Sequence, residues 1–503
     1  MTRVRAAIFV ACAVLAGCGQ GTSGGDPHAV SAPGRPPIVM IVFDEFSTVS
    51  LLDAHGRIDA ARYPNFARLG RDATWFPYST ASLDETGRAI RAMFTSRTQV
   101  HWERPNYANN PRNLFTLLGR RYRMEASEES SSFCPKRLCP NVRPQNQRTI
   151  EAELEEGRPE RFLSWTESLI ASKRPTFYFK HTLLPHAPWL YLRSGRFYVN
   201  GPSEGDLPVE SWRYNPWLIR QIYQRHLLQV EFTDSLIGSA LDQLRASGLY
   251  DRAMIVVSAD NGESFGRPGY GHLINRRNVG DIALTPLFVK LPFQRAGRID
   301  RRHVRTVDIL PTIARVAQLK PSWQVEGRPL FGAGSHKIPS TTLVLERSGH
   351  QMRLSLRELR RRSAEALRLK LKLFGSGNRP PGMFGIGPRP ELVGTPVSKW
   401  PALPLGSRRA ELDGADRLKS VQLDSPTLPV KVTGRLAGSE RTAPLDLAIA
   451  VNGTIAATAP AIAPRDGATR IFTLLIPESS LHDGANTVEL FAIENGRALR
   501  PLG

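Results

Sequence analysis

The chain has 503 residues, more than one typical domain contains, and 41% of them are hydrophobic, which is enough for a large packed core. No stretch reaches the roughly 20 apolar residues of a spanning helix, so we expect no transmembrane helix. The formal net charge is +21. This charge favours an anionic partner, whether nucleic acid, anionic lipid or acidic glycan, without choosing among them.

The N-terminus has the features of an export signal. A basic start leads into an apolar run over residues 6–15, which is too short to span a membrane as a mature helix. Small residues then precede Cys18, an order that resembles a bacterial lipobox, in which the cysteine is acylated. An ordinary cleaved signal peptide and a short buried segment are the alternatives. We expect a lipoprotein signal peptide over 1–18 and a Gly-, Ser- and Pro-rich tether over 19–36. The protein would then be exported, anchored to a membrane through lipid and facing the periplasm or the extracellular side, which makes nucleic acid the least suitable partner.

Two further cysteines, Cys134 and Cys139, lie close together in the sequence. Because an exported protein meets oxidising conditions, we expect a disulfide that closes a small loop between them. A redox-active or zinc-binding pair is the alternative, but no further cysteine or close histidine completes such a site.

Four apolar runs rich in β-branched or aromatic residues predict strands that are buried on both faces. They cover residues 38–43, 176–179, 254–259 and 284–291. Between the second and the third, apolar residues at helical spacing from Leu227 to Leu244 predict a helix, and Gly248 stands where its C-cap would fall. Strands that alternate with helices predict an α/β domain over 37–335 with a mostly parallel central sheet and flanking helices.

Polar residues follow two of these strands directly. Asp44 and Glu45 come after the first, and Asp260 and Asn261 come after the third. Because the carboxyl ends of parallel strands meet at one edge of a sheet, we expect the two groups to converge there. Carboxylate and amide oxygens suit a hard divalent cation, whereas either group alone is more often a helix N-cap or the start of a loop.

The C-terminal part has a different pattern. Residues 336–404 form a basic segment and a linker rich in Gly and Pro, in which 357–366 has helical character and 367–373 alternates as a strand would, so the pattern leaves that boundary open. After 405 short alternating runs predict a small β-sandwich-like domain over 405–503. Its signals are a hairpin at Asn452-Gly453 and further strands at 429–434, 470–476 and 487–493.

A series of short segments between residues 37 and 330 stands in the order of the motifs of a known family. They are 38–45 (IVMIVFDE), 63–69 (YPNFARL), 86–97 (TGRAIRAMFTSR), 181–189 (HTLLPHAPW), 230–238 (VEFTDSLIG), 258–263 (SADNGE) with 271–272 (GH), and 307–312 (VDILPT). In these segments the chain resembles the sulfatase branch of the alkaline phosphatase superfamily, which includes sulfatases and phosphoethanolamine- and phosphoglycerol-transferases. Any one segment is weak support, but their shared order makes chance agreement very improbable.

The resemblance implies a role for each matching residue. Thr86 corresponds to the nucleophile at the start of a helix, and His186 and His272 to residues that contact the substrate or transfer protons. The implied ligands of one divalent cation are Asp44, Glu45, Thr86, Asp260 and Asn261, with Ca, Mn, Mg and Zn not distinguishable. Arg88, Lys180 and His186 would bind the transferred anionic group, and His181 is assigned a structural role. The competing interpretations are a helix cap for Thr86, a packed loop histidine for His186 and a solvated helix face for Arg88.

Two departures from the family bear on the reaction. Classical sulfatases use Cys or Ser oxidised to formylglycine, which Thr86 cannot form, whereas Asn261 is more typical of sulfatases than of the phosphotransferases. We therefore predict a metal-dependent hydrolase or transferase that acts on phosphate esters, and possibly sulfate esters, of an envelope lipid or glycan through a threonyl intermediate. A sulfuric ester hydrolase with unmodified threonine and a non-catalytic glycan- or lipid-binding protein of the same fold are the alternatives.

Overall fold

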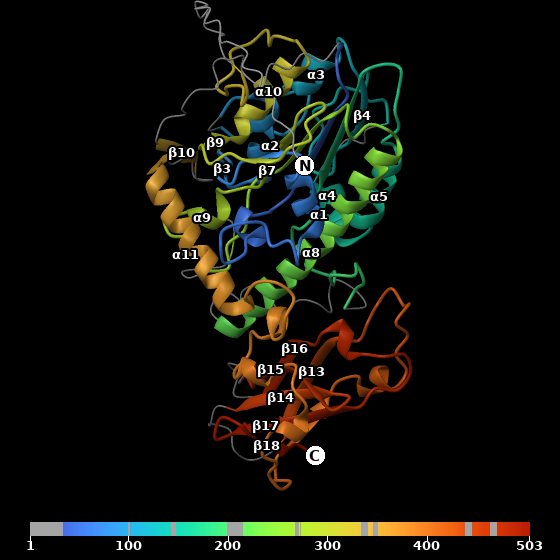
Figure 1. Ribbon diagram of the computed structural model, residues 1–503, viewed down its shortest axis with the longest axis vertical. Helices are drawn as coiled ribbons and strands as arrows, with labels where there is room; N and C mark the ends of the chain where they lie inside the picture. Colours follow the sequence, from blue (N-terminus) through green and yellow to red (C-terminus); the bar gives the residue numbers. More distant parts are fainter. Residues whose placement is uncertain are drawn as a thin grey trace, which may run out of the picture.

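The computed structural model describes residues 34–98, 101–141, 147–198, 215–266, 271, 273–332, 341–345, 351–437, 445–462 and 470–503. An α/β part and a C-terminal β part lie one above the other in Figure 1. The lower end of α8 (Pro216–Ala246) reaches from the first part to the second, where the indole N–H of Trp217 donates to the carbonyl of Thr473 at 3.3 Å. The boundaries drawn from the sequence at 335 and 405 stay predictions.

The central sheet of the α/β part has seven strands in the order β4-β5-β1-β6-β7-β2-β8. Their bounds are Arg123–Ser127 for β4, Thr176–Thr182 for β5, Ile38–Phe43 for β1, Met254–Ala259 for β6, Leu287–Lys290 for β7, Thr74–Trp75 for β2 and Arg298–Ile299 for β8. The strand β1 runs parallel to both β5 and β6, and β4 runs parallel to β5, whereas β7 is antiparallel to β6. This confirms the predicted mostly parallel α/β sheet.

Every residue of β1 is buried, and successive side chains of a strand point to opposite faces of the sheet. Both faces of this sheet are therefore covered. One face contributes Val39, Ile41 and Phe43 to the largest hydrophobic core, and the other contributes Ile38, Met40 and Val42 to a second core. The first core also takes side chains from α1 (Pro64–Gly70), α5 (Arg158–Glu167) and α8, and the second from α2 (Thr86–Thr95), α3 (Leu114–Leu118) and α10 (Ile309–Val316). The sheet is therefore the middle of three layers.

Two of the family-like segments meet at the contact between α1 and α8. The carboxylate of Asp234 on α8 accepts hydrogen bonds from the backbone N–H groups of Asn65 at 3.1 Å and Phe66 at 2.8 Å. A Cβ atom at Gly238 would lie 2.8 Å from the side chain of Asn65, so a larger residue would have to displace Asn65. The predicted helix ends as expected at Ala246, and Gly248 follows with φ of 68°. These motif residues thus hold the scaffold together.

The helix α11 (Leu356–Phe374) continues through the run whose pattern alternates in the sequence. Its buried positions are Leu359, Ser363, Lys370 and Phe374, which follow helical spacing. Because two of these four buried residues are polar, the spacing of the hydrophobic residues in the sequence does not show the helical period. The ammonium group of Lys370 reaches the carbonyls of Ser50 at 2.8 Å and Leu52 at 2.6 Å, which explains why a lysine stands on the packed face.

The C-terminal part is built from two antiparallel sheets. One has β12 (Arg409–Leu412), β13 (Lys431–Ala437) and β16 (Ile471–Leu475), and the other has β15 (Thr454–Pro460), β14 (Asp446–Val451), β17 (Val488–Glu494) and β18 (Ala498–Pro501). The hairpin predicted at Asn452-Gly453 joins β14 to β15, with φ of 50° and 76° at the two turn residues. The predicted antiparallel, β-rich region is confirmed.

The remaining elements are short. They are α4 (Gln147–Glu155), α9 (Val279–Ile282), β3 (Ser79–Thr80) paired with β9 (Val304–Arg305), and β10 (Thr341–Leu345) paired with β11 (Gln351–Ser355). Turns of 3₁₀ helix follow α11, including η3 (Gly382–Phe384). Among the helices that the structure describes, none has both the length and the apolar character needed to cross a membrane.

Candidate active site

Three polar side chains gather where β1, β5 and β6 end. Asp44 follows β1, Asp260 follows β6, and His181 is the next-to-last residue of β5. Each has a potential ligand atom, and these atoms lie within 4.8 Å of one another, although all three residues are buried. We call Asp44, His181 and Asp260 the site cluster. The parallel register brings them together, because Phe43 pairs with Ala259 on one side and with Thr182 on the other.

Several buried atoms in and beside the site cluster lack a hydrogen-bond partner among the described residues. They are Oδ2 of Asp260, Oδ1 of Asn261 and Nε2 of His181. The other carboxylate oxygen of Asp260 accepts from the backbone N–H groups of Glu45 at 3.2 Å and Asn261 at 2.6 Å. Buried polar atoms are rarely left unpaired without a reason. Here two of the three atoms belong to the site cluster, and the third belongs to the residue after Asp260.

The electrostatics of the site cluster fit a bound cation. Burial, and next to it the charge of Asp44, raise the pKa of Asp260 well above its ordinary value. Burial lowers the pKa of His181 to about 4, which keeps the ring neutral and able to offer a lone pair. Two carboxylates, an amide oxygen and a neutral imidazole form a ligand set for a divalent metal, and a cation would remove the repulsion between the carboxylates. The residues present therefore fit a divalent cation.

Thr86 stands at the rim of the site cluster as the first residue of α2. Its hydroxyl donates to Oδ1 of Asp44 at 3.1 Å, and its side chain is partly exposed. The first N–H groups of a helix have no partner within the helix, and together with the helix dipole they attract anions. The helix α2 has ten residues and Glu85 at its N-cap makes no side-chain capping bond. A hydroxyl group and a helix N-terminus that can attract an anion thus lie next to each other.

Glu45 links the end of β1 to a loop that carries His186. Its backbone has φ of 57°, in the left-handed region that costs free energy for any residue with a Cβ atom. Its carboxylate Oε1 lies 3.3 Å from Nε2 of His186, whose side chain is 24% exposed. Of the predicted ligands, Asp44 and Asp260 thus join the site cluster, Asn261 lies next to it, and Glu45 faces His186.

Two buried residues that the sequence analysis did not identify hold the His186 loop. The guanidinium of Arg158 donates to the carbonyls of His186 at 2.7 Å and Pro188 at 2.5 Å. The amide of Gln229 on α8 donates to Pro185 at 3.1 Å and His186 at 3.0 Å. Arg158 is fully buried, and its guanidinium charge is stabilised by hydrogen bonds to these carbonyl oxygens instead of by water. No sequence pattern marks either residue, because the contacts join segments that are distant along the chain.

The other predicted site residues are arranged differently. Lys180 points away from His181, since neighbours in a strand face opposite sides, and its ammonium group pairs with the buried carboxylate of Glu129. Arg88, in the first turn of α2, lies 3.4 Å from Glu85. His272 lies outside the described residues, as does Cys18. The expected disulfide between Cys134 and Cys139 is present in the structure.

The sequence pattern favours a structural role for His181, whereas the structure places it beside Asp44 and Asp260 in the site cluster. Its signal was a polar residue at the end of a strand that is buried on both faces. Strand alternation also implies that Lys180 and His181 cannot both face the site. The sequence alone does not say which of the two does.

Comparisons with known proteins agree with this fold. The model of the Sulfatase family matches residues 36–319, more than half of the chain, so the chain belongs to the sulfatase family. It is therefore a sulfatase-like hydrolase of the alkaline phosphatase superfamily. A search of curated proteins found no match.

Three solved structures illustrate the structural likeness. BT4656, solved with its substrate D-glucosamine-2-N,6-O-disulfate, has 15% identity and a TM-score of 0.49, with 63% of this chain and 86% of that chain covered. The phosphonate monoester hydrolase of Silicibacter pomeroyi has 15% identity, a TM-score of 0.42 and coverage of 62% and 79%. That of Agrobacterium radiobacter has 16% identity, a TM-score of 0.44 and coverage of 62% and 80%. These values are too low to assign a substrate.

Proposed function

We propose that the protein is a metal-dependent enzyme that cleaves phosphate esters through a covalent ester on Thr86. The observation that carries this proposal is the contact of 3.1 Å from the Thr86 hydroxyl to Asp44, at the start of α2 and beside the site cluster. A free threonine hydroxyl is a weak nucleophile, and an adjacent acceptor and a cation are what activate it.

The first half of the reaction forms the threonyl ester. As Oγ1 of Thr86 bonds to phosphorus, its proton passes to Oδ1 of Asp44, the atom to which the hydroxyl donates. The bond from phosphorus to the leaving oxygen breaks, and His186 gives the leaving alcohol a proton. The Glu45 carboxylate lies 3.3 Å from Nε2 of His186 and can orient the ring for this step.

The second half returns the enzyme to its initial state. Water, or an acceptor alcohol, attacks phosphorus while His186 takes the proton of the attacking oxygen. The bond between phosphorus and Oγ1 breaks, and Thr86 recovers its proton from Asp44. Asp44, His181 and Asp260, with Asn261 beside them, would hold a divalent cation, which would supply positive charge to stabilise the transferred group.

Sulfate ester hydrolysis is the second candidate, because the chain belongs to the sulfatase family and carries Asn261. A formylglycine hydrate releases sulfate by elimination, and a threonyl ester has no such route. Phosphoryl transfer depends mainly on positioning and charge stabilisation, which a metal and a helix N-terminus provide. We therefore expect phosphate esters to be cleaved faster than sulfate esters.

The test compares phosphate monoesters, phosphate diesters, phosphonate monoesters and sulfate monoesters with several divalent cations. Thr86→Ala should lower phosphoester turnover by about 10³-fold or more, whereas Thr86→Ser should retain a large part of it. Thr95→Ala is the matched control, since this hydroxyl at the other end of α2 donates to the carbonyl of Arg91. Mass analysis after brief incubation should detect a phosphoryl adduct on the Thr86 peptide of the wild type. Turnover that persists in Thr86→Ala, or without added cation, would contradict the mechanism.

The location and the substrate belong to the same proposal. A lipid at Cys18 would hold the enzyme at a membrane, where envelope lipids and glycans carry phosphate and sulfate esters. Cys18→Ser should release the mature protein from the membrane fraction or stall its processing. Partitioning into detergent and a protein mass that are both unchanged by this substitution would exclude the anchor.

A further inference from the structure

We propose that the loop over residues 128–139, which ends in the Cys134–Cys139 disulfide, positions the side chain of His181. Ser130 is the residue that determines which ring nitrogen of His181 faces the metal site. This inference rests on the metal site of the proposed function. It goes beyond that function because it assigns a role to a loop that lies outside the site cluster.

The contact between Ser130 and His181 is the first step. The hydroxyl of Ser130 lies 2.9 Å from Nδ1 of His181, and both side chains are buried. The other ring nitrogen, Nε2, has no hydrogen-bond partner among the described residues. If Nδ1–H donates to Ser130, the lone pair of the neutral ring is at Nε2, which is then the nitrogen left to bind a cation. Histidine ligands in metal sites are commonly held in this way by a partner on the second nitrogen.

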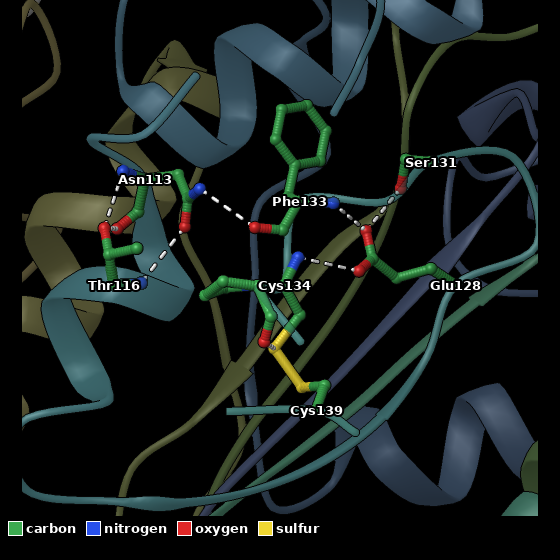
Figure 2. The surroundings of a disulfide bond; sticks show 8 residues. Asn113, Thr116, Glu128, Ser131, Phe133, Cys134 and Cys139 are labelled. Carbon is green, nitrogen blue, oxygen red and sulfur yellow. Dashed lines mark hydrogen bonds between the residues drawn. A yellow bond between two sulfur atoms is a disulfide. The ribbon is translucent and has the colours of Figure 1, made fainter. Parts of the chain in front are cut away.

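The disulfide end of the loop is held by one buried carboxylate, as Figure 2 shows. Glu128 accepts hydrogen bonds from the hydroxyl of Ser131 at 2.8 Å and from the backbone N–H groups of Phe133 at 2.8 Å and Cys134 at 3.0 Å. The side chain of Asn113 donates to the carbonyl of Phe133 at 3.1 Å. The disulfide thus fixes the end of a segment that has Ser130 near its start.

The start of the loop is held by the neighbouring residue. Glu129 is buried, pairs with the ammonium group of Lys180, and accepts from the backbone N–H of Leu183 at 3.0 Å. Lys180 precedes His181 in β5. Ser130 therefore directly follows two anchored glutamates: Glu128 is bonded to the disulfide end of the loop, and Glu129 is bonded to Lys180 and Leu183 at the end of β5. This double anchoring leaves the Ser130 hydroxyl little freedom to leave Nδ1.

The experiment measures metal affinity on the folded, metal-free protein, with Mn²⁺ and Zn²⁺ titrated by calorimetry. Ser130→Ala should weaken metal binding by about 10-fold or more, the usual effect of removing a supporting partner. Ser130→Thr, which keeps the hydroxyl, should restore most of the affinity. The double substitution Cys134→Ser, Cys139→Ser should weaken binding in the same direction. Ser132→Ala is the matched control on the same loop, where the backbone of Ser132 bonds with Pro105 and Tyr107.

A double-mutant cycle separates positioning from a general structural effect. In a His181→Ala background, Ser130→Ala should have no further effect on metal affinity, because the group that it orients is absent. A lower melting temperature with wild-type metal affinity in Ser130→Ala would show a structural role only and overturn the inference. If the wild type and Ser130→Ala bind the cation with equal affinity, the inference is overturned and the proposed function stays intact. Wild-type protein that binds no cation would overturn both.

Discussion

Two groups of buried ionisable side chains in the molecule differ in how their charges are balanced. The site cluster combines two carboxylates with a neutral imidazole. The second group, which we call the helix cluster, lies beneath α11 and consists of Asp59, Arg62, Glu231 and Lys370. All members of both groups are at most 5% exposed, so burial alone does not distinguish a functional group of charges from a structural one.

The helix cluster joins charges of opposite sign and uses the backbone to satisfy them. Gly377 donates its N–H to Asp59 at 2.7 Å, and the guanidinium of Arg62 donates to the carbonyl of Gly377 at 2.8 Å. The carbonyls of Ser50 and Leu52 accept from Lys370. These contacts attach α11 and the chain after it to the segment that follows β1. The helix cluster therefore balances positive against negative charge within the chain, although Nη1 of Arg62 and Oε1 of Glu231 have no hydrogen-bond partner among the described residues.

The site cluster has the opposite balance. Its two carboxylates repel each other, as the raised pKa of Asp260 indicates, and it leaves an oxygen of Asp260 and a nitrogen of His181 unpaired among the described residues. A buried arrangement of this kind becomes favourable only with a cation that the chain does not supply. Excess charge of one sign, rather than burial, is what marks the site.

The sharpest test makes the same substitution in both clusters. Asp260→Asn should lower metal affinity and phosphoester turnover by more than about 100-fold, beyond the range for supporting residues. The metal-free protein should keep or gain stability, because the repulsion from Asp44 is removed. Asp59→Asn should do the reverse, with near wild-type turnover per folded molecule and a loss of about 3 kcal/mol of stability, since Arg62 and Lys370 lose a facing charge.

Metal titration, turnover and urea unfolding of the two variants, with and without cation, provide the measurements. Added cation at 100 times its dissociation constant should stabilise the wild type and Asp59→Asn by about 2.7 kcal/mol, and should leave Asp260→Asn unchanged. Equal losses of stability and activity in the two variants would mean that both clusters are structural, and the distinction between them would fail.

The same contrast explains how far the sequence could lead. The convergence of Asp44 and Asp260 was predictable, because each follows a continuous β-branched run and parallel strands end at one edge. The place of Thr86 at the start of a helix was predicted from a family motif. His181 and Lys180 could not be separated, since alternation assigns them to opposite faces without saying which face is the site.

Other features depended on contacts that no local pattern records. Lys370 occupies a packed position of α11 because the carbonyls of Ser50 and Leu52 accept its hydrogen bonds, and those residues are distant in the sequence. Ser130 and Arg158 act through buried hydrogen bonds to loops that only the folded chain brings near. Hydrophobic periodicity does not identify residues of this kind. A polar residue is expected to be exposed, and its burial makes sense only when its hydrogen-bond partner is known.

A further difference concerns the pH dependence of the helix cluster. Burial raises the pKa of Glu231 to about 7, although Arg193 and Arg62 act in the opposite direction. The folded state then binds the proton more tightly than the unfolded state, so Glu231 makes the wild type lose stability as the pH rises from about 4.5 to about 7. In Glu231→Gln this loss is absent. The free energy of unfolding of the variant should therefore improve relative to the wild type by up to about 1.4 kcal/mol per pH unit in this range and remain level above it.

Urea unfolding at a series of pH values measures this difference, with Glu391→Gln as the control for an exposed glutamate. The control removes the carboxylate of a half-exposed glutamate and so measures the effect of losing a carboxylate that is not buried. The difference in the free energy of unfolding between Glu231→Gln and the wild type could instead stay constant from pH 4.5 to 7, or change in favour of the wild type. Either result would mean that the facing cations already compensate the charge of Glu231. Charge balance in the helix cluster would then be more complete than its geometry indicates, and the contrast with the site cluster would be larger.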